Sequence, residues 1–500
     1  MSMSVEVIRC GAAALDRATL DANVARITGG LEKLGITQGD RVALLLKNSI
    51  AFVEISLAIG RLGAFPVPIN WHFAAVEIDV LLKDCDPAAI FVHEDLGASL
   101  PESWKQDRRT MFVGADDAPS PYASWRDGSD LFNGPDRQAP GSIVYTSGTT
   151  GRPKGVKRCP PTPEQQASMR AIRSDLYRMD ASSRVLVPGP LYHAFPNQFA
   201  IHGVLTAEYT EIMPRFDAEA MLATIQRERI TSVALAPIMF VRLLRLPAET
   251  RQACDLSSLR WALHAGGPCA DDVKRAMIDW WGPIVAEYYG GTEVGALTLC
   301  SSAEWLDRPG TCGKPLEDVE FRIVDAEGVD VARGEAGEIF GRLRSYPDFT
   351  YHNDPAKRAE VGLGDLVSLG DIGYQDEDGY LFLCDRARDM VVSGGVNIYP
   401  AEVEKALFAI PGVADCAAFG VPDPEFGEMI VAFVVGDNLD ADGLRKRLRE
   451  TIAGYKVPKL IRQVETLHRD ASGKIRKHVL RDQFLAASGV QAPAQAPHSR

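Results

Sequence analysis

Residues 145–155 read YTSGTTGRPKG and directly follow the apolar residues SIV at 142–144. Glycines let the backbone approach a ligand closely, and the amides and hydroxyls of such a loop donate hydrogen bonds to phosphate oxygens. Lys154 adds a positive charge at its end. The spacing is not the G-x-x-x-x-G-K-[ST] of P-loop nucleotidases, which excludes that class. The stretch therefore predicts a polyanion site where a buried strand ends, with a polar surface turn as the alternative.

Length and composition limit the remaining choices. A chain of 500 residues is too long for one compact core, so we expect two or more domains. The net charge of −13 makes nucleic acid and anionic membranes poor candidates as partners. The sequence shows no signal peptide and no apolar run of membrane-spanning length. Nine cysteines are scattered singly, which suits a reducing compartment, so we predict a cytoplasmic protein.

Short apolar runs alternate with segments of helical periodicity through the first two thirds of the chain. Apolar residues at i, i+3 and i+4 spacing predict helices at 15–35 and 216–230. This alternation predicts an α/β fold with parallel sheets covered by helices. The predicted buried strands are RVALLL (41–46), AAIFVH (88–93), SIVYTS (142–147), RVLVPG (184–189), SVALAP (232–237) and LRWALHA (259–265).

The pattern changes after about residue 315. VEFRIVD (319–325), GEIFGRL (337–343) and GYLFLCD (379–385) are strands joined by Gly and Asp turns, which predicts an antiparallel β subdomain at about 315–387 without intervening helices. It completes a large N-terminal domain, 1–387, with two helix-covered sheets. Residues 388–487 then predict a small, mobile α+β domain. Its helices lie at 400–410 and 442–452, its strands at 416–421, 428–435 and 460–467, and a disordered tail follows at 488–500.

The string S-G-T-T-G-x-P-K-G at 147–155 resembles the phosphate-loop motif of the adenylate-forming (AMP-binding) enzymes, which include acyl-CoA synthetases, peptide-synthetase adenylation domains and firefly luciferase. Five more motifs follow in the order and at the spacing of this family, so the resemblance covers residues 40 to about 480. They are HAGGPC (264–269), EYYGGTEVG (287–295), SLGDIGYQDEDGYLFLCDRARDM (368–390), SGGVNIYPAEVE (393–404) and ASGKIRK (471–477).

The resemblance implies a reaction in which a carboxylate attacks the α-phosphate of ATP, giving acyl-AMP and pyrophosphate, before coenzyme A takes the acyl group. The two anions repel each other by roughly 4 kcal/mol per charge pair at about 4 Å and an effective dielectric of about 20. Mg²⁺ and lysines are the natural cations to offset that repulsion. The implied substrates and cosubstrates are a small carboxylic acid, ATP, Mg²⁺ and coenzyme A.

The resemblance also implies residue roles in the large domain. Tyr288 and Tyr289 would flank the adenine, Thr292 would donate to the α-phosphate, and Glu293 would hold Mg²⁺ with Thr146. Asp371 and Arg386 would bind the ribose hydroxyls. The implied ATP-binding residues are Thr146, Ser147, Gly148, Thr149, Thr150, Gly151, Lys154, Gly266, Gly267, Glu287, Tyr288, Tyr289, Thr292, Asp371 and Arg386. Leu369 and Cys384 depart from the common family residues without removing a named contact, and Val396 replaces the Glu common in the 393–404 segment, which leaves the details of that turn open.

The small domain would carry two functional faces. By resemblance, Lys474 bridges the substrate carboxylate and the α-phosphate, and it is catalytic together with Thr292 and Glu293. Gly394 and Gly395 would line the pantetheine tunnel, and Arg388 would be the hinge about which the domain rotates between the two half-reactions. The attacking nucleophile is then the thiol of coenzyme A, which agrees with the missing G-x-S-x-G elbow.

The acyl pocket is the least determined part. By resemblance it includes His193, Ala234, Gly267 and Gly290, with His193 as a gate beside the carboxylate, although a lone histidine after an apolar strand is often a core residue. The expected walls, 193–203, 234–240 and 265–267, are mostly apolar and contain no arginine. They predict a medium- or long-chain fatty acid, or a bulkier aryl or steroid-type acid, rather than a dicarboxylate.

Other functions remain open at this point. A stand-alone adenylation enzyme would pass its acyl group to a separate carrier protein, because only 26 residues follow Lys474. A luciferase-like oxygenase and a catalytically dead binding protein are further alternatives, whereas the missing nucleophile argues against a hydrolase. A homodimer is compatible with the sequence. An AMP-forming acyl-CoA synthetase agrees best with the complete set of motifs.

Overall fold

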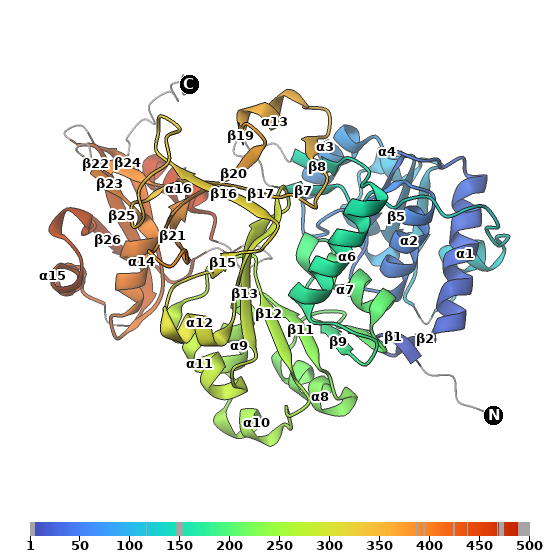
Figure 1. Ribbon diagram of the computed structural model, residues 1–500, viewed down its shortest axis with the longest axis horizontal. Helices are drawn as coiled ribbons and strands as arrows, with labels where there is room; N and C mark the ends of the chain where they lie inside the picture. The colour runs from blue at the N-terminus through green and yellow to red at the C-terminus, as the bar shows by residue number, and fades with distance from the viewer. Residues whose placement is uncertain are drawn as a thin grey trace. The chain divides into compact units, whose positions relative to one another are not determined.

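The computed structural model describes residues 6–116, 118–146, 154–386, 389–393, 396–423, 426–437, 439–467, 469 and 475–488. The chain divides into two compact units (Figure 1). Unit 1 comprises Met1–Phe321 and Gly341–Val367, and unit 2 comprises Arg322–Phe340 and Ser368–Arg500. This division does not test the domain boundary predicted at residue 388. The limits of the predicted β subdomain also stay predictions.

A nine-stranded sheet forms the largest layer of unit 1. Its inner strands pair in parallel, and antiparallel strands close both edges. Inner strands such as SVAL at 232–235 are buried at every residue, as expected for strands covered on both faces. In spatial order the strands are β15 (Lys314–Pro315), β14 (Gly295–Cys300), β13 (Val285–Gly291), β12 (Trp261–His264), β11 (Ser232–Leu235), β9 (Arg184–Val187), β10 (Tyr209–Ile212), β1 (Glu6–Cys10) and β2 (Ala13–Asp16).

A second sheet of unit 1 is parallel throughout. Its order is β4 (Phe65–Pro68), β3 (Arg41–Leu45), β5 (Ala89–His93) and β6 (Thr110–Val113). Parallel strands need crossover connections, and helices supply them here, for example between β3 and β4. The two helix-bearing sheets confirm the predicted α/β class.

The helices of unit 1 follow the apolar periodicity of the sequence. The helix predicted at 216–230 is α8 (Ala218–Glu228), and the one predicted at 15–35 is α1 (Arg17–Lys33). The others are α2 (Ile50–Arg61), α3 (Ala75–Cys85), α4 (Glu102–Lys105), α5 (Pro121–Asp127), α6 (Pro163–Tyr177), α7 (Ala194–Thr206), α9 (Pro237–Leu244), α10 (Ala248–Ala253), α11 (Asp271–Trp281), α12 (Ser302–Asp307) and α13 (Ala356–Glu360), with a 3₁₀ turn at Glu94–Ser99.

A small antiparallel sheet corrects one strand prediction. SIVYTS (142–147) was expected in a parallel sheet, but its strand β7 (Val144–Thr146) pairs antiparallel with β8 (Lys154–Arg158), which pairs with β18 (Phe349–Tyr351). The partner strands follow directly or lie about 200 residues later, so the apolar run alone could not reveal the pairing. This sheet carries the end of the glycine-rich loop.

The region after residue 315 contains the antiparallel pairs that its turns predicted. β19 (Gly362–Leu363) and β21 (Leu381–Arg386) both pair antiparallel with β20 (Leu366–Gln375). The sheet order is β16 (Val319–Val324), β17 (Gly337–Leu343), β20 and β19, and β16, β17 and β20 each contribute residues to both units. The expectation of no helix here is wrong, because α13 occupies Ala356–Glu360.

Unit 2 also contains an α+β layer with its own core. Helices α14 (Pro400–Phe408), α15 (Ala441–Thr451) and α16 (Lys477–Ser488) accompany a sheet ordered β23 (Val396–Ile398), β22 (Val391–Ser393), β25 (Gly427–Gly436) and β24 (Val413–Asp423), with β26 (Leu460–Gln463) also on β25. A 3₁₀ turn spans Gly454–Lys456. β26 ends at Gln463, so only the first half of the strand predicted at 460–467 forms.

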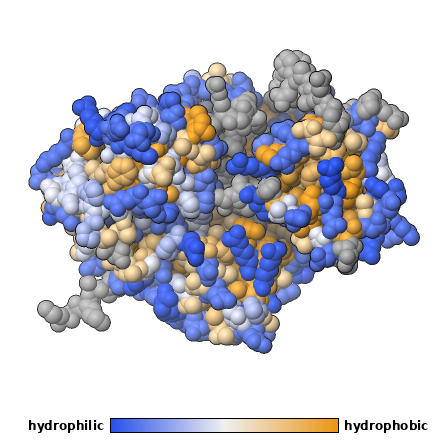
Figure 2. Space-filling view, turned by 180° about the vertical axis from the view of Figure 1, so that it is seen from behind, coloured by the Kyte–Doolittle hydropathy of each residue, from blue (hydrophilic) through white to orange (hydrophobic). Residues whose placement is uncertain are grey.

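The surface mixes polar and apolar residues. Figure 2 shows separate hydrophobic patches among hydrophilic residues on one face of the molecule. Among the helices that the structure describes, none combines the length and the apolar character needed to cross a membrane.

Candidate active site

Two neighbouring strands of the small sheet bring a lysine and a tyrosine together. Lys154 begins β8, and Tyr351 ends β18, which pairs with β8 in antiparallel register. The Lys154 ammonium lies 5.5 Å from the centre of the Tyr351 ring, a cation–π distance. The hydroxyl of Tyr351 donates to the carboxylate of Glu293 at 3.3 Å. The structure thus places the predicted phosphate-loop lysine and the predicted metal ligand around one tyrosine.

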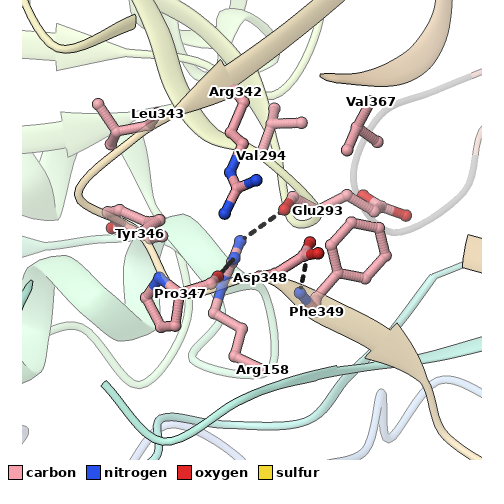
Figure 3. A pocket seen from close by; sticks show the side chains of 10 residues that line it. All are labelled: Arg158, Glu293, Val294, Arg342, Leu343, Tyr346, Pro347, Asp348, Phe349 and Val367. Carbon is pink, nitrogen blue, oxygen red and sulfur yellow. Dashed lines mark hydrogen bonds between the residues drawn. The ribbon is translucent and has the colours of Figure 1, made fainter. Parts of the chain in front are cut away.

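Arg158 holds the turn that carries Glu293. Residues 292–294 connect β13 to β14, and the guanidinium of Arg158 donates to the carbonyls of Thr292 at 2.6 Å and Glu293 at 2.9 Å. It also donates to the carbonyl of Pro347 at 3.1 Å. Three carbonyl acceptors fix the guanidinium, so Arg158 fixes the turn in return. Figure 3 shows Arg158 reaching into a pocket toward the main chain of Glu293.

The lining of that pocket combines four charged side chains with apolar ones. Arg342 points into it from the side opposite Arg158, and Asp348 lies beside them (Figure 3). The pocket is lined by Arg158, Glu293, Val294, Arg342, Leu343, Tyr346, Pro347, Asp348, Phe349 and Val367, all of which belong to unit 1. Because the Arg158 guanidinium already donates to three carbonyls, this pocket shows how the turn that carries Glu293 is held in place.

The electrostatic environment agrees with an anion site. Burial lowers the pKa of the Lys154 ammonium, and the nearby Lys357 lowers it further. Burial raises the pKa of the Tyr351 phenol, and the carboxylate of Glu293 raises it more, so Tyr351 stays protonated and can donate its hydrogen bond. A polyphosphate bound beside Lys154 would favour its charged form.

The oxygen ligands predicted here suit Mg²⁺ rather than a metal ion that is enclosed by protein side chains alone. Nowhere in the described residues do three His, Cys, Asp or Glu side chains gather as a metal-binding group. Mg²⁺ commonly uses one or two protein carboxylates and completes its shell with water and substrate phosphates. The single carboxylate of Glu293 fits that requirement. Of the second predicted ligand, Thr146, the structure describes the main chain, which lies opposite Lys154 in the sheet.

The two tyrosines predicted to flank the adenine lie on opposite faces of β13. They are consecutive residues of one strand, so their side chains point apart. The ring of Tyr288 packs edge to face on Phe195 with centroids 5.0 Å apart, whereas Tyr289 is buried. At most one of the two can therefore stack on a base on a given side of the sheet. Their predicted joint role stays a prediction.

Glu287 has a protein partner that the sequence did not reveal. Its carboxylate lies 2.5 Å from the ammonium of Lys274, a fully buried residue of α11, and 3.8 Å from Nε2 of His264. Burial raises the pKa of Glu287 against the opposing effect of Lys274. This pair ties α11 to β13, a structural role beside the predicted ATP contact.

The residues predicted for the acyl pocket come from three neighbouring regions. His193 is the N-cap residue of α7, its ring lies 4.5 Å from that of Tyr192, and Ala234 is buried within β11. Position 290 has no room for a side chain, because a Cβ there would lie 2.0 Å from the carbonyl oxygen of Gly295. Backbone packing thus suffices to require glycine at 290.

The segments predicted to bind adenine and ribose belong to different units of the structure. Gly266 follows β12 with a φ of +90°, a conformation that favours glycine, and Gly267 comes next. In unit 2, Asp371 of β20 lies directly opposite Arg386 of β21. Asp371 is 7% exposed. The predicted ribose contacts are therefore cross-strand neighbours.

Several predicted residues lie outside the described residues. They are Ser147, Gly148, Thr149, Thr150 and Gly151 of the loop, the hinge residue Arg388, the tunnel residues Gly394 and Gly395, and Lys474. Their roles remain predictions from the resemblance.

The structure adds residues that sequence reasoning missed. Arg158 lies four residues after Lys154 in the same strand. Side chains alternate along a strand, so both lie on one face, and the sequence alone could have indicated Arg158. Tyr346 and Tyr351 come nearly 200 residues later, and no local pattern connects them to the loop. A fourth, Arg173 of α6, donates to the Tyr346 hydroxyl at 3.4 Å.

Comparison with known proteins confirms the family resemblance. Residues 6–345 match the AMP-binding enzyme family, and residues 402–474 match the AMP-binding enzyme C-terminal domain. The chain is 35% identical over 497 residues to a feruloyl-CoA synthase of Amycolatopsis sp, covering 97% of each chain. It is 33% identical to an indoleacetate–CoA ligase of Aromatoleum aromaticum, covering 93% of this chain and 92% of that one.

Solved structures agree with this result. The ATP-bound MatB of Rhodopseudomonas palustris superimposes with a TM-score of 0.86 at 29% identity, and 97% of each chain is covered. Both the fold and the chemistry of ATP-dependent acid activation with thioester formation are thereby supported along nearly the whole chain. The chain belongs to the AMP-binding enzyme family and is an AMP-forming acyl-CoA synthetase.

Proposed function

We propose that this enzyme activates an apolar carboxylic acid, and that within the predicted range of fatty, aryl and steroid-type acids an aryl acid fits best. The observation that carries the proposal is the set of aromatic rings next to His193. Phe195 packs on Tyr288 at 5.0 Å, and Tyr177 lies 6.3 Å from Phe195. Edge-to-face rings favour aromatic partners over flexible chains.

The names of the relatives agree with an aryl acid. The feruloyl-CoA synthase and the indoleacetate–CoA ligase are named for acids that contain aromatic rings. For this chain its own residues support the same class, because Tyr177, Phe195 and Tyr288 come from three separate elements and contact one another near the predicted gate.

The remaining roles form one proposed reaction scheme. Lys154 and Thr292 bind the phosphates, and Glu293 with Thr146 would hold Mg²⁺, which would neutralise phosphate charge. Tyr351 orients the Glu293 carboxylate through its hydrogen bond. Lys474 then approaches the carboxylate and the α-phosphate, and rotation about Arg388 replaces it by the Gly394–Gly395 segment for coenzyme A. The cytoplasmic location and the homodimer remain predictions.

A panel assay tests the proposal. The purified enzyme would be given ATP, Mg²⁺ and single acids from aryl, fatty, steroid-type and dicarboxylic classes, with and without coenzyme A, and pyrophosphate release would be followed. We expect aryl acids to give the highest kcat/KM and coenzyme A to be consumed. Reaction of dicarboxylates alone, such as malonate, would show that the pocket is not apolar. Activation that turns over only with an added carrier protein would favour the stand-alone adenylation enzyme.

A further inference from the structure

A charged residue occupies the inner face of α6. Along this helix Gln166, Met169, Arg173 and Tyr177 are half-buried or buried, and their spacing of three, four and four residues places them on one face. Arg170, three residues before Arg173, is exposed. An arginine between a methionine and a buried tyrosine is unusual, because a helix normally presents apolar side chains on its inner face.

One donor of the Arg173 guanidinium is buried and has no partner. A guanidinium has five N–H donors. The one acceptor that the described residues offer Arg173 is the hydroxyl of Tyr346, at 3.4 Å, and its Nε is buried without a partner. Within the described part of the chain no carboxylate forms an ion pair with it. A donor that is buried without a partner is costly to retain, and function is one reason for keeping it.

Support of Tyr346 does not account for Arg173. Arg158 already lies 4.8 Å from the ring of Tyr346, closer than Arg173 at 5.8 Å, and Arg158 is fixed by three carbonyl oxygens. Burial raises the pKa of Tyr346, but the charges of Arg173 and Arg158 outweigh that effect and the net direction is downward. A second arginine at the same ring adds repulsion between like charges, so its value has to come from another partner.

His202 provides a second, independent observation. It belongs to α7, is 8% exposed, and its Nε2 lies buried without a hydrogen-bond partner. Its ring lies 5.5 Å from that of Tyr177, one turn of α6 beyond Arg173. Burial lowers the pKa of His202 to about 4, and Arg173 contributes to the decrease, so the imidazole is neutral near pH 7. Two adjacent helices therefore direct unsatisfied polar groups to one place.

Aromatic rings connect this place to the predicted acyl site. Phe195 lies two residues after the predicted gate, His193, and contacts both Tyr288 and Tyr177. Phe195 and Tyr288 retain accessible surface, as Arg173 does. The side chains that lead from His193 to Arg173 are thus aromatic, namely Phe195 and Tyr177. The charged guanidinium of Arg173 lies at the end of this row.

We propose that Arg173 is a specificity-determining residue of the acyl site, whose guanidinium donates a hydrogen bond to a neutral oxygen substituent at the far end of an aryl carboxylic acid. The inference rests on the proposed function, because it assumes that the acid enters beside His193. We choose a neutral oxygen over a second carboxylate because the neighbouring rings of Tyr177 and Phe195 are apolar, and the 4-carboxy acid in the test decides between the two.

The test compares isosteric acids. Benzoic, phenylacetic and cinnamic acids carrying a 4-hydroxyl, 4-methyl or 4-carboxyl group would be assayed by pyrophosphate release, with kcat and KM measured separately. The wild-type enzyme should prefer the 4-hydroxy acid to the 4-methyl acid by about tenfold or more, the effect of one hydrogen bond from a charged donor. Arg173→Met should lower kcat/KM for the 4-hydroxy acid by about 10- to 100-fold and change that for the 4-methyl acid by less than about threefold.

Matched variants separate recognition from damage to the fold. Arg170→Met removes an exposed charge from the same helix and should leave both acids unchanged. If Arg173→Met is insoluble, Arg173→Lys, which keeps the charge but not the planar fork, should give an intermediate preference. A wild-type enzyme that does not distinguish 4-hydroxy from 4-methyl acids overturns the proposal without any variant. A folded Arg173→Met enzyme that loses both acids equally, or a preference for the 4-carboxy acid, also overturns it.

A failure of the proposed function would give a different result in the same assay. If no acid of any class releases pyrophosphate, the proposed function is wrong. If straight-chain acids alone react, an apolar substrate stands and the role of Arg173 is refuted.

Discussion

Glu54 should make the protein less stable as the pH rises from about 4.5 to about 7, and Glu54→Gln should remove that loss. Glu54 is 1% exposed. It accepts from Asn23 at 2.6 Å and from the hydroxyl of Tyr122 at 3.4 Å, and Arg126 lies 3.7 Å away. Burial raises the pKa of Glu54 to about 7, in spite of those three partners, and Asp116 adds to the increase. The carboxyl therefore titrates near neutrality in the folded protein.

The sign and the size follow from the two pKa values. Below the unfolded value of 4.5 both states are protonated and no penalty exists. As the pH rises from there to about 7 the unfolded chain releases its proton while the folded Glu54 keeps it, so the free energy of unfolding falls. At about 1.4 kcal/mol per pKa unit the loss reaches about 3 kcal/mol and is then constant at higher pH. Glutamine has nearly the same shape and no charge, so it avoids the loss.

Urea unfolding of wild type and variant at pH 5 and pH 8 measures this effect. Glu54→Gln should be within about 1 kcal/mol of wild type at pH 5 and more stable by up to about 3 kcal/mol at pH 8. Glu32→Gln, on the exposed face of α1, is the control and should change neither value. A Glu54→Gln protein that is equally destabilised at both pH values would show that Glu54 is ionised throughout and that its contact with Arg126 stabilises the fold.

Three further predictions concern the active site. Tyr351→Phe removes the hydrogen bond to Glu293 and should lower kcat/KM for MgATP by about five- to tenfold, measured by pyrophosphate release at limiting Mg²⁺. Arg158→Met leaves three carbonyls without their donor and should lower the free energy of unfolding by about 3 kcal/mol, together with activity, as urea unfolding and the same assay would show. Lys474→Ala should abolish acyl-AMP formation but largely spare thioester formation from supplied acyl-AMP, with Arg388→Pro doing the reverse; equal loss of both steps in either variant would contradict two separate faces.

The sequence predicted those elements whose cause is local. The helix α8 follows from apolar spacing between Asp217, which caps its N-terminus, and Arg229 at its C-terminal end. Five strands of the parallel sheets, β3, β5, β9, β11 and β12, follow from apolar runs of six or seven residues. In both cases the periodicity and the end signals lie within one segment, so no distant partner is needed to recognise it.

The sequence could not predict pairings that depend on distant segments. β7 is an apolar run like those of the large sheets, but it belongs to a sheet completed by β18, about 200 residues later. The same distance separates Lys154 from Tyr351. Motif resemblance supplied Lys154 and Glu293, yet it named neither the tyrosine between them nor Arg158, because those contacts arise from register across strands.

The predicted acyl walls show a second kind of limit. They were chosen as stretches of sequence, 193–203, 234–240 and 265–267, and in those stretches no arginine occurs. The structure adds α6 to this region through the contacts of Tyr177 with the rings of α7. Because Arg173 lies one helical turn before Tyr177, an arginine lies beside a region whose sequence contains none.

The net charge of the protein and the charge within its site govern different kinds of binding. The value of −13 belongs mostly to exposed side chains, whose fields are screened within about 8–10 Å by salt, so it bears on which large partners can approach. Lys154, Arg158 and Arg173 are half-buried or buried and gather around Tyr346 and Tyr351, where screening is weak. An acidic enzyme can therefore offer local positive charge to a polyphosphate, because these half-buried cations are screened less than charges on the open surface.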